Sequence, residues 1–213
     1  MLSLTRLPKS PFLYPILDSA FSANLIKDGL EVIRAGVRIF QIRAKDLTKA
    51  RVFEIIRELE PAAQEKEVLM IVNDFVDVAL VSRHCGVHLG QEDFPVADCR
   101  RILPERIIGF STHNHEQFRA ALDLPVDYLA VGPIFHTSTK ETSNKELGPT
   151  FIEDVRPMTH LPIVGIGGIR ESNFSSLIKA GADGIACISE LYRKPDLFST
   201  ISRLQDAIYN EKV

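Results

Sequence analysis

Short apolar runs rich in β-branched residues recur along the chain at intervals of roughly 20 to 30 residues. Each run has the length of a β-strand, and the intervals suit strand–helix units. The predicted strands are residues 12–18, 37–43, 68–73, 86–89, 106–111, 127–132, 162–166 and 184–188. Strands that alternate with helices in this way are typical of a parallel sheet.

The segments between these strands have the apolar spacing of amphipathic helices. In residues 22–36 the predicted buried face consists of Leu25, Ile26, Leu30 and Ile33, and Gly36 follows as a helix stop. Similar patterns predict helices over residues 50–64, 113–123, 173–183 and 196–208. Eight strand–helix units in 213 residues predict an α/β fold, a single (β/α)8 TIM barrel that forms one domain over residues 1–213. A doubly wound open sheet is the alternative.

Composition and charge exclude several other classes of protein. The formal net charge of −3 argues against a general nucleic-acid-binding surface, so any anion chemistry must come from a local cluster. No apolar run reaches membrane-spanning length, and the first twelve residues are too interrupted for a signal peptide. The three cysteines contain no CxxC pair, which fits a reducing compartment, and we expect a cytoplasmic protein. The oligomeric state is left open.

Polar side chains end the second predicted strand. Because successive side chains of a strand alternate between its faces, Gln41, Arg43 and Lys45 share one face. Val37 and Ile39 are expected on the same face. In a (β/α)8 barrel the site lies at the carboxyl ends of the strands, so the three polar side chains are predicted to reach the barrel mouth. An arginine that only caps the barrel through ion pairs is the alternative.

Amide and acidic side chains follow the next two strands. Asn73 and Asp74 end the third strand, and Asp93 follows the fourth. Either acid alone could cap a helix N-terminus. Together they put two carboxylates at neighbouring strand ends, and Mg²⁺ is commonly held by one or two carboxylates plus substrate phosphates. Beside Arg43 and Lys45, they predict a site for a magnesium-bound polyphosphate.

The later strand ends add hydroxyl groups and glycines. Ser111 and His113 follow the fifth strand, and the irregular stretch 133–149, long enough for a functional lid, carries further hydroxyls and two lysines, of which Lys140 lies nearer the strand. A polar surface loop is the alternative for that stretch. Gly167 and Gly168 follow the seventh strand, where main-chain N–H groups often build a phosphate site in this fold.

Seven stretches together resemble the thiamine-phosphate synthase family. They are QIRAK (41–45), VND (72–74), HLGQED (88–93), GFSTH (109–113), VGPIFHTSTK (131–140), GIGGI (165–169) and GADGIACIS (181–189). They occur in the family's order from about Tyr14 to Ser189. The last two are shared with related phosphate-binding barrels, whereas the set as a whole is specific.

The resemblance implies an enzyme that joins a hydroxymethylpyrimidine diphosphate to a thiazole phosphate and releases pyrophosphate. It implies that the pyrimidine diphosphate is bound by Gln41, Arg43, Lys45, Asn73, Ser111 and Lys140, with Ile42 and Ala44 also among the substrate-binding residues. It assigns the thiazole phosphate to Thr137, Ser138, Thr139, Gly168, Ile188 and Ser189, together with Gly167. Catalytic roles fall to Arg43, Lys45, Ser111 and Lys140, and Asp74 and Asp93 would bind Mg²⁺ as the cofactor. The expected partners are these small-molecule substrates, without nucleic acid or membrane.

Three other functions remain open at this point. A thiazole tautomerase shares the barrel and uses a histidine in a setting like Ser111-x-His113, but it needs no diphosphate or magnesium site. A non-catalytic phosphate-binding barrel would be expected to lack a basic or acidic residue of the set, and none is missing. A sugar-phosphate epimerase would need facing acid and base residues, which the strand ends do not clearly offer. The synthase is therefore favoured.

Overall fold

Eight parallel strands close into a barrel in the computed structural model, which describes residues 7–137 and 145–211. The strands are β1 (Phe12–Asp18), β2 (Ile39–Arg43), β3 (Leu69–Asn73), β4 (Cys85–Leu89), β5 (Ile108–Thr112), β6 (Tyr128–Val131), β7 (Ile163–Gly165) and β8 (Gly184–Cys187). Each strand pairs with the next in sequence, and β8 closes on β1 with Phe12 opposite Gly184. The predicted α/β fold, a (β/α)8 barrel, is confirmed, and the open sheet is excluded.

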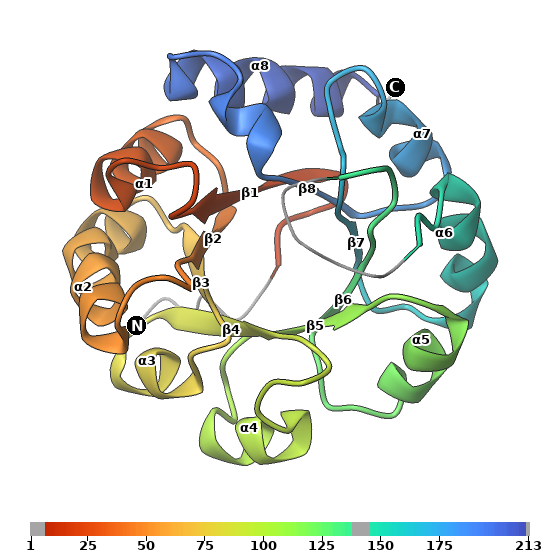
Figure 1. The fold of residues 1–213 in the computed structure, drawn as a ribbon, viewed down its shortest axis with the longest axis horizontal. Helices are drawn as coiled ribbons and strands as arrows, with labels where there is room; N and C mark the ends of the chain where they lie inside the picture. Colours follow the sequence, from red (N-terminus) through yellow and green to blue (C-terminus); the bar gives the residue numbers. More distant parts are fainter. Residues whose placement is uncertain (1–6, 138–144, 212–213) are drawn as a thin grey trace.

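Helices surround the strands in a ring (Figure 1). They are α1 (Leu25–Arg34), α2 (Lys49–Glu65), α3 (Val76–Val81), α4 (Val96–Ile102), α5 (His115–Ala121), α6 (Pro149–Val155), α7 (Phe174–Lys179) and α8 (Leu197–Asn210), with 3-10 turns η1 (Arg156–Met158) and η2 (Ser189–Tyr192). Side-chain caps begin four of them: Asn24, Thr48, Asn114 and Asp196 each accept a hydrogen bond from a main-chain N–H in the first turn. No helical pattern is evident in the sequence for α3, α4 and α6, although α5 and α7 are equally short.

The buried face of α1 differs from the prediction at one position. Leu25 and Ile33 are buried as expected, and Gly36 ends the helix with φ of +78°. Leu30 is 44% exposed, however, and Gly29 and Val32 are buried in its place. Gly29 lies against Leu59 of α2, where a Cβ would come within 2.6 Å of the leucine, so the face that α1 turns toward α2 contains Gly29 and not Leu30.

Two apolar layers hold the barrel together. The outer layer lies between the strands and the helices, and it contains Phe40 and Ile42 of β2. The inner layer fills the barrel and contains Ile39 of the same strand. The alternation predicted for β2 is therefore correct, except that Val37 precedes the strand and belongs to the outer layer. The three cysteines are buried free thiols.

The end of the barrel opposite the mouth carries the same polar clamp twice. Arg100 forms an ion pair at 2.7 Å with Asp127, whose carboxylate also accepts a hydrogen bond from the Ile108 N–H. Arg156 forms an ion pair at 2.7 Å with Asp183, whose carboxylate accepts from the Ile163 N–H. In each case the aspartate directly precedes a strand, so the clamp ties a helical segment to the strand entrances.

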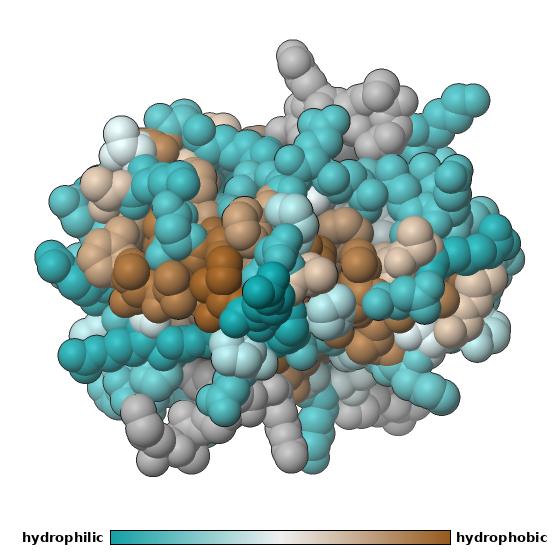
Figure 2. All heavy atoms as spheres, turned by 90° about the horizontal axis from the view of Figure 1, so that it is seen from below, coloured by the Kyte–Doolittle hydropathy of each residue, from teal (hydrophilic) through white to brown (hydrophobic). Residues whose placement is uncertain are grey.

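One side of the molecule exposes apolar side chains. Figure 2 looks onto the side of α3 and α4, where hydrophobic residues gather among polar ones. Leu80 and Val81 of α3 and Ile102 of α4 are at least 40% exposed. No helix within residues 7–137 and 145–211 is both long enough and apolar enough to cross a membrane.

Candidate active site

A cavity opens at the carboxyl ends of the strands. The predicted site residues that line it are Gln41, Arg43, Asn73, Ser111, Thr137, Gly167, Gly168, Ile188 and Ser189. Side chains from β1, β4 and β6 complete the walls, among them Tyr14, His88 and Ala130. The barrel thus brings together residues that are far apart in the sequence. Ser138, Thr139 and Lys140 lie outside the described residues.

Arg43 is held in the cavity wall by an acid that the sequence did not single out. Asp18 ends β1 directly opposite Arg43 in the register, and its carboxylate forms an ion pair with the guanidinium. Asp18 is 2% exposed and also accepts a hydrogen bond from the Ala20 N–H at 2.9 Å. Arg43 therefore makes an ion pair, as an arginine that only caps the barrel would. It also lines the cavity, however, and keeps further N–H donors for an anion.

Lys45, Asp74 and Asp93 form a charged cluster next to Asn73. The Lys45 ammonium lies 3.0 Å from the Asp74 carboxylate. Burial and a hydrogen bond with the Asp93 carboxyl raise the pKa of Asp74, and Lys45 offsets only part of this rise. Two carboxyl groups that share one position with a single lysine repel each other when both are ionised, and a divalent cation would relieve that repulsion.

Neither acid serves as the helix cap that was the alternative. The residues that begin α3 and α4 are Phe75 and Pro95, and no side chain caps either helix. Asp74 has φ of +66°, a left-handed conformation that is uncommon outside glycine, and Asp93 accepts a hydrogen bond from the Gly90 N–H at 2.6 Å. Such conformations are found more often at functional sites, where they set the direction of a side chain, here the Asp74 carboxylate.

The donor set fits Mg²⁺ and no larger metal cluster. Two aspartates supply hard oxygen ligands, which magnesium takes in ones and twos and completes with water and phosphate oxygens. In the part of the chain that the structure describes, no three histidine, cysteine or acidic side chains gather as a metal site would need. A zinc-type centre with three or four protein ligands is therefore not formed by these residues.

Gly167 and Gly168 form a tight turn at the mouth, directly after β7. Their φ angles are +98° and +61°, and a side chain at Gly168 would come within 2.3 Å of the His136 carbonyl oxygen. The Asn173 side chain fixes this turn, since its amide donates to the Gly168 carbonyl at 3.1 Å. Among the described residues, the N–H groups of Gly168 and Ser189 donate no hydrogen bond, which leaves them for a phosphate.

Inside the barrel, five side chains are joined in one hydrogen-bond chain. Gln41 Nε2 donates to the Tyr14 hydroxyl at 3.1 Å, and the Tyr14 and Tyr128 hydroxyls are 2.8 Å apart. His88 Nδ1 lies 2.9 Å from the Tyr128 hydroxyl, and its Nε2 lies 2.8 Å from Ser111 Oγ. His88 thus makes hydrogen bonds through both ring nitrogens near the end of β4. The two tyrosines were missed because their strands are apolar, although a tyrosine inside such a strand is itself a signal of a buried hydroxyl.

His113 occupies the cavity wall in a fixed orientation. Its Nδ1 lies 2.6 Å from the Gly132 carbonyl, and its main-chain N–H donates to the Gln117 side chain at 2.8 Å. Since a carbonyl only accepts, Nδ1 carries the proton. The position of His113 is compatible with both the synthase and the tautomerase.

The side chains of Ile42 and Ala44 point away from the cavity. Both are buried in the outer apolar layer, with Ile42 fully covered. Strand alternation explains this, because their neighbours Gln41 and Arg43 take the inner face. Any contact of Ile42 or Ala44 with substrate would have to come from the main chain.

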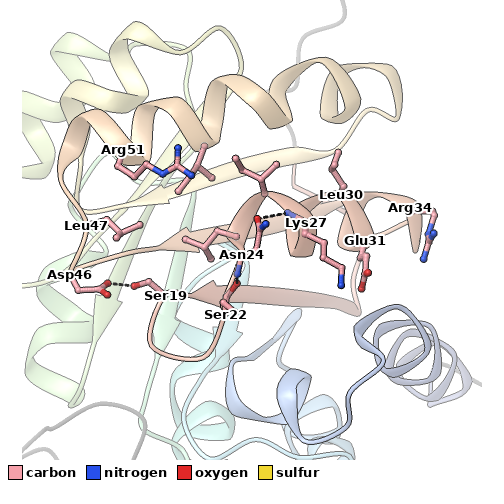
Figure 3. Close-up of a pocket in the computed structure, with 14 residues that line it drawn as sticks. Ser19, Ser22, Asn24, Lys27, Leu30, Glu31, Arg34, Asp46, Leu47 and Arg51 are labelled. Atoms are coloured by element: carbon pink, nitrogen blue, oxygen red, sulfur yellow. Dashed lines mark hydrogen bonds between the residues drawn. The ribbon is translucent and has the colours of Figure 1, made fainter.

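A larger hollow of about 660 Å³ lies outside the barrel, between α1 and α2 (Figure 3). Lys27, Glu31 and Arg34 of α1 line it on one side, and Arg51 of α2 lines it on the other. Ser19 and Asp46, which are hydrogen-bonded to each other, close one end. None of the predicted site residues that the structure describes belongs to it, and its charges do not converge on one point. The mouth cavity is therefore the candidate active site.

A (β/α)8 barrel is typical of enzymes that bind phosphate esters when its mouth carries a cationic and acidic cluster, here at β2–β4, and a glycine turn whose main-chain N–H groups suit a phosphate, here the phosphate cup at β7–β8. Comparison with known proteins gives the family: a family profile described as thiamine monophosphate synthase matches residues 13–191. The chain belongs to this thiamine-phosphate synthase family.

Individual relatives agree over nearly the whole chain. The thiamine-phosphate synthase of Bacillus cereus is 39% identical over 197 residues, which are 89% of this chain and 90% of the relative. The thiamine-phosphate synthase of Lawsonia intracellularis is 35% identical over 199 residues, with 92% of each chain covered. The solved structure of thiamine phosphate pyrophosphorylase from Pyrococcus furiosus is 30% identical, with a TM-score of 0.86 over 94% of this chain and 96% of that one. The protein is accordingly a transferase of thiamine biosynthesis.

Proposed function

We propose that the mouth cavity binds the pyrimidine diphosphate at β2–β5 and the thiazole phosphate at β6–β8, and that Mg²⁺ takes part in the reaction. The observation that carries this proposal is the pairing of Asp74 with Asp93 beside Lys45, together with a separate phosphate cup across the same mouth. Two phosphate-bearing substrates need two anion sites, and one active site with both is what a synthase requires. The closed barrel also supports the interpretation of the chain as one domain.

At the β2–β5 side, Arg43 would bind the diphosphate with the N–H groups that Asp18 leaves available. Lys45 would add a second positive charge and Ser111 a hydroxyl donor, and Gln41 and Asn73 would bind the pyrimidine ring or its substituents. Lys140 belongs to the proposed set as well. Because charge develops on the departing pyrophosphate, donors held in advance at that position lower the barrier.

Asp74 and Asp93 would hold Mg²⁺. When bound there, the ion supplies positive charge that offsets the charge of the diphosphate oxygens. The two carboxylates are adjacent and partly buried before any ion binds, which agrees with the raised pKa of Asp74.

At the β6–β8 side, the N–H groups of Gly168 and Ser189 would bind the thiazole phosphate, and Gly167, Thr137, Ser138, Thr139 and Ile188 complete the proposed set. The thiazole nitrogen has no proton to lose when it attacks the pyrimidine methylene carbon, so no general base is needed. Holding both substrates in one cavity would supply much of the acceleration through orientation. The tautomerase alternative would use His113, but it leaves the acidic pair without a role.

The first experiment mixes purified protein with the pyrimidine diphosphate, the thiazole phosphate and Mg²⁺ and measures both products. Equal amounts of thiamine phosphate and pyrophosphate, abolished by EDTA and restored by excess Mg²⁺, are expected. Product that is unaffected by EDTA would remove the magnesium proposal. Binding of the thiazole phosphate without any product would favour the tautomerase, and His113→Asn would then be tested in that reaction.

A further inference from the structure

The hydrogen-bond chain inside the barrel connects the two ends of one proposed substrate site. Gln41 stands at one end on β2, and Ser111 stands at the other on β5. Between them lie Tyr14 of β1, Tyr128 of β6 and His88 of β4, and each of these three is at most 7% exposed. These hydrogen bonds therefore cross the barrel interior through side chains that are almost fully buried.

Each hydroxyl in the chain has a single proton to give, so the donors follow one another in order. Burial raises the pKa of both Tyr14 and Tyr128, which keeps both hydroxyls protonated. One order that starts from Gln41 Nε2 donating to Tyr14 uses each hydroxyl proton once: Tyr14 donates to Tyr128, and Tyr128 donates to His88 Nδ1. His88 is then neutral, with its proton on Nε2, and donates to Ser111 Oγ.

The opposite order would satisfy the same pairs of residues if the Gln41 amide were turned over so that its oxygen accepts from Tyr14, but it conflicts with the ligand. It would need the Ser111 proton to point at His88, whereas a diphosphate oxygen only accepts hydrogen bonds and needs that proton itself. In the order that starts from Gln41 Nε2, the Ser111 proton remains available to the cavity. At the other end, Gln41 keeps its carbonyl oxygen available for a donor, as the amino group of an aminopyrimidine would be.

We propose that Tyr14, Tyr128 and His88 are positioning residues that lock Gln41 as an acceptor toward the pyrimidine amino group and Ser111 as a donor toward the diphosphate. The inference rests on the proposed function for the identity of the substrate. The barrel interior thus helps to determine specificity: a pyrimidine that presents an acceptor in place of the amino group can be bound only if the whole chain reverses. In a buried network of this kind, all donors and acceptors are paired only when every hydrogen bond along it runs in the same direction.

The protonation state of His88 tests the order without any turnover. Ring nitrogen chemical shifts of the ¹⁵N-labelled protein are expected to show a neutral imidazole protonated at Nε2, both free and with the pyrimidine diphosphate. Tyr128→Phe removes the donor to Nδ1, so His88 should become a mixture of its two neutral tautomers. Tyr14→Phe keeps the contact between Tyr128 and His88, so His88 should stay protonated at Nε2. An Nδ1-protonated ring, or an imidazolium, in the wild-type protein would overturn the proposal.

Steady-state kinetics test the effect on the substrate. Tyr128→Phe and Tyr14→Phe should each raise KM for the pyrimidine diphosphate about tenfold and leave KM for the thiazole phosphate within about twofold, because only the first substrate contacts the chain. Tyr14→Phe should also weaken by about tenfold the preference for the amino substrate over an analogue with oxygen at that position.

Thr112→Val is the matched control for both variants. Thr112 neighbours Ser111 on β5, is fully buried, and its hydroxyl donates to the Ala130 carbonyl at 3.2 Å, outside the chain. It should lower stability without changing either KM. If the tyrosine variants behave like Thr112→Val, the positioning role is wrong. If the wild-type protein forms no thiamine phosphate, the proposed function fails, and the His88 tautomer still decides the order of the chain.

Discussion

The Arg43 guanidinium and the Asp18 carboxylate form an ion pair across neighbouring strands at the mouth of the barrel. Asp18 is almost fully buried, so it holds the arginine while remaining out of reach of the ligand. Asp18→Asn removes the charge and keeps the shape. We expect KM for the pyrimidine diphosphate to rise about tenfold and the free energy of unfolding to fall by about 1–3 kcal/mol.

Glu67→Gln is the control for that variant. Glu67 pairs with Arg38 at 3.4 Å, and both side chains are about half exposed, so its loss should change stability by less than about 0.5 kcal/mol. Steady-state kinetics give KM for the pyrimidine diphosphate, and urea unfolding gives the free energy of unfolding, for Asp18→Asn and Glu67→Gln side by side. An unchanged KM in Asp18→Asn would mean that Arg43 needs no partner to reach the substrate.

The pKa of Asp74 predicts how stability depends on pH without metal. Because burial and Asp93 raise this pKa in the folded state, the ionised carboxylate is less favourable there than in the unfolded chain. Stability should therefore fall as the pH rises from the ordinary aspartate value, about 3.9, through the raised value. Above that range, added Mg²⁺ should increase Tm, and below it the ion should have little effect. Thermal unfolding at several pH values, with and without MgCl₂, measures both.

Two variants separate this effect from general changes of charge. Asp74→Asn should raise Tm in the absence of metal at neutral pH and should abolish the response to Mg²⁺. Asp77→Asn changes an exposed acid of α3 that pairs with Lys49, and it should keep the full response. A response to Mg²⁺ that survives in Asp74→Asn would place the ion elsewhere.

Asp93→Asn should affect turnover far more than folding. The amide oxygen of asparagine can still accept the hydrogen bond from Gly90, so the loop should keep its shape. We expect the Mg²⁺ concentration for half-maximal activity to rise by at least about tenfold, while Tm changes little. Parallel losses of Tm and of activity would count against the role of Asp93 as a ligand.

Gly168→Ala should damage the phosphate cup. The substitution forces a left-handed φ on alanine and drives its Cβ against the main-chain oxygens of His136 and Phe135. Gly36→Ala is the matched control, since its φ is also positive but no atom lies within 4 Å of the new Cβ. Both should lose about 1 kcal/mol from strain. Only Gly168→Ala should lose more than that and raise KM for the thiazole phosphate; equal effects in the two variants would refute the crowding argument.

Asp127→Ala should separate stability from activity. The change removes the ion pair with Arg100 and leaves the Ile108 N–H without its acceptor, at the end of the barrel opposite the mouth. We expect a loss of about 1–3 kcal/mol in the free energy of unfolding. Both KM values should be unchanged at a temperature where the variant is folded. A selective change in either KM would mean that the two ends of the barrel are coupled.

The sequence was sufficient to predict the barrel because all eight strands have apolar, β-branched runs at regular intervals, even though α3, α4 and α6 showed no helical pattern. Gln41 and Arg43 could be located for the same reason, since alternation along β2 fixes their side. Asp18 and Tyr128 could not be found in this way. In the sequence, Asp18 looks like an ordinary residue at a strand end, and Tyr128 looks like a core residue. Their roles depend on Arg43 and His88, which lie on other strands and cannot be inferred from the local pattern. The exposure of Leu30 was missed because Gly29, which draws the helices together, carries no apolar signal of its own.

The two clamps at the strand entrances have a consequence for the order in which the barrel assembles. Each joins an arginine to an aspartate only 27 residues further along, so each can form within its own pair of strands as soon as that part of the chain collapses. The contact between β1 and β8 joins the two ends of the chain and has the greatest loop-closure entropy to overcome. We therefore expect the closing seam to form late. The walls of the mouth cavity include residues of both β1 and β8, so the complete cavity would exist only after these two strands have paired.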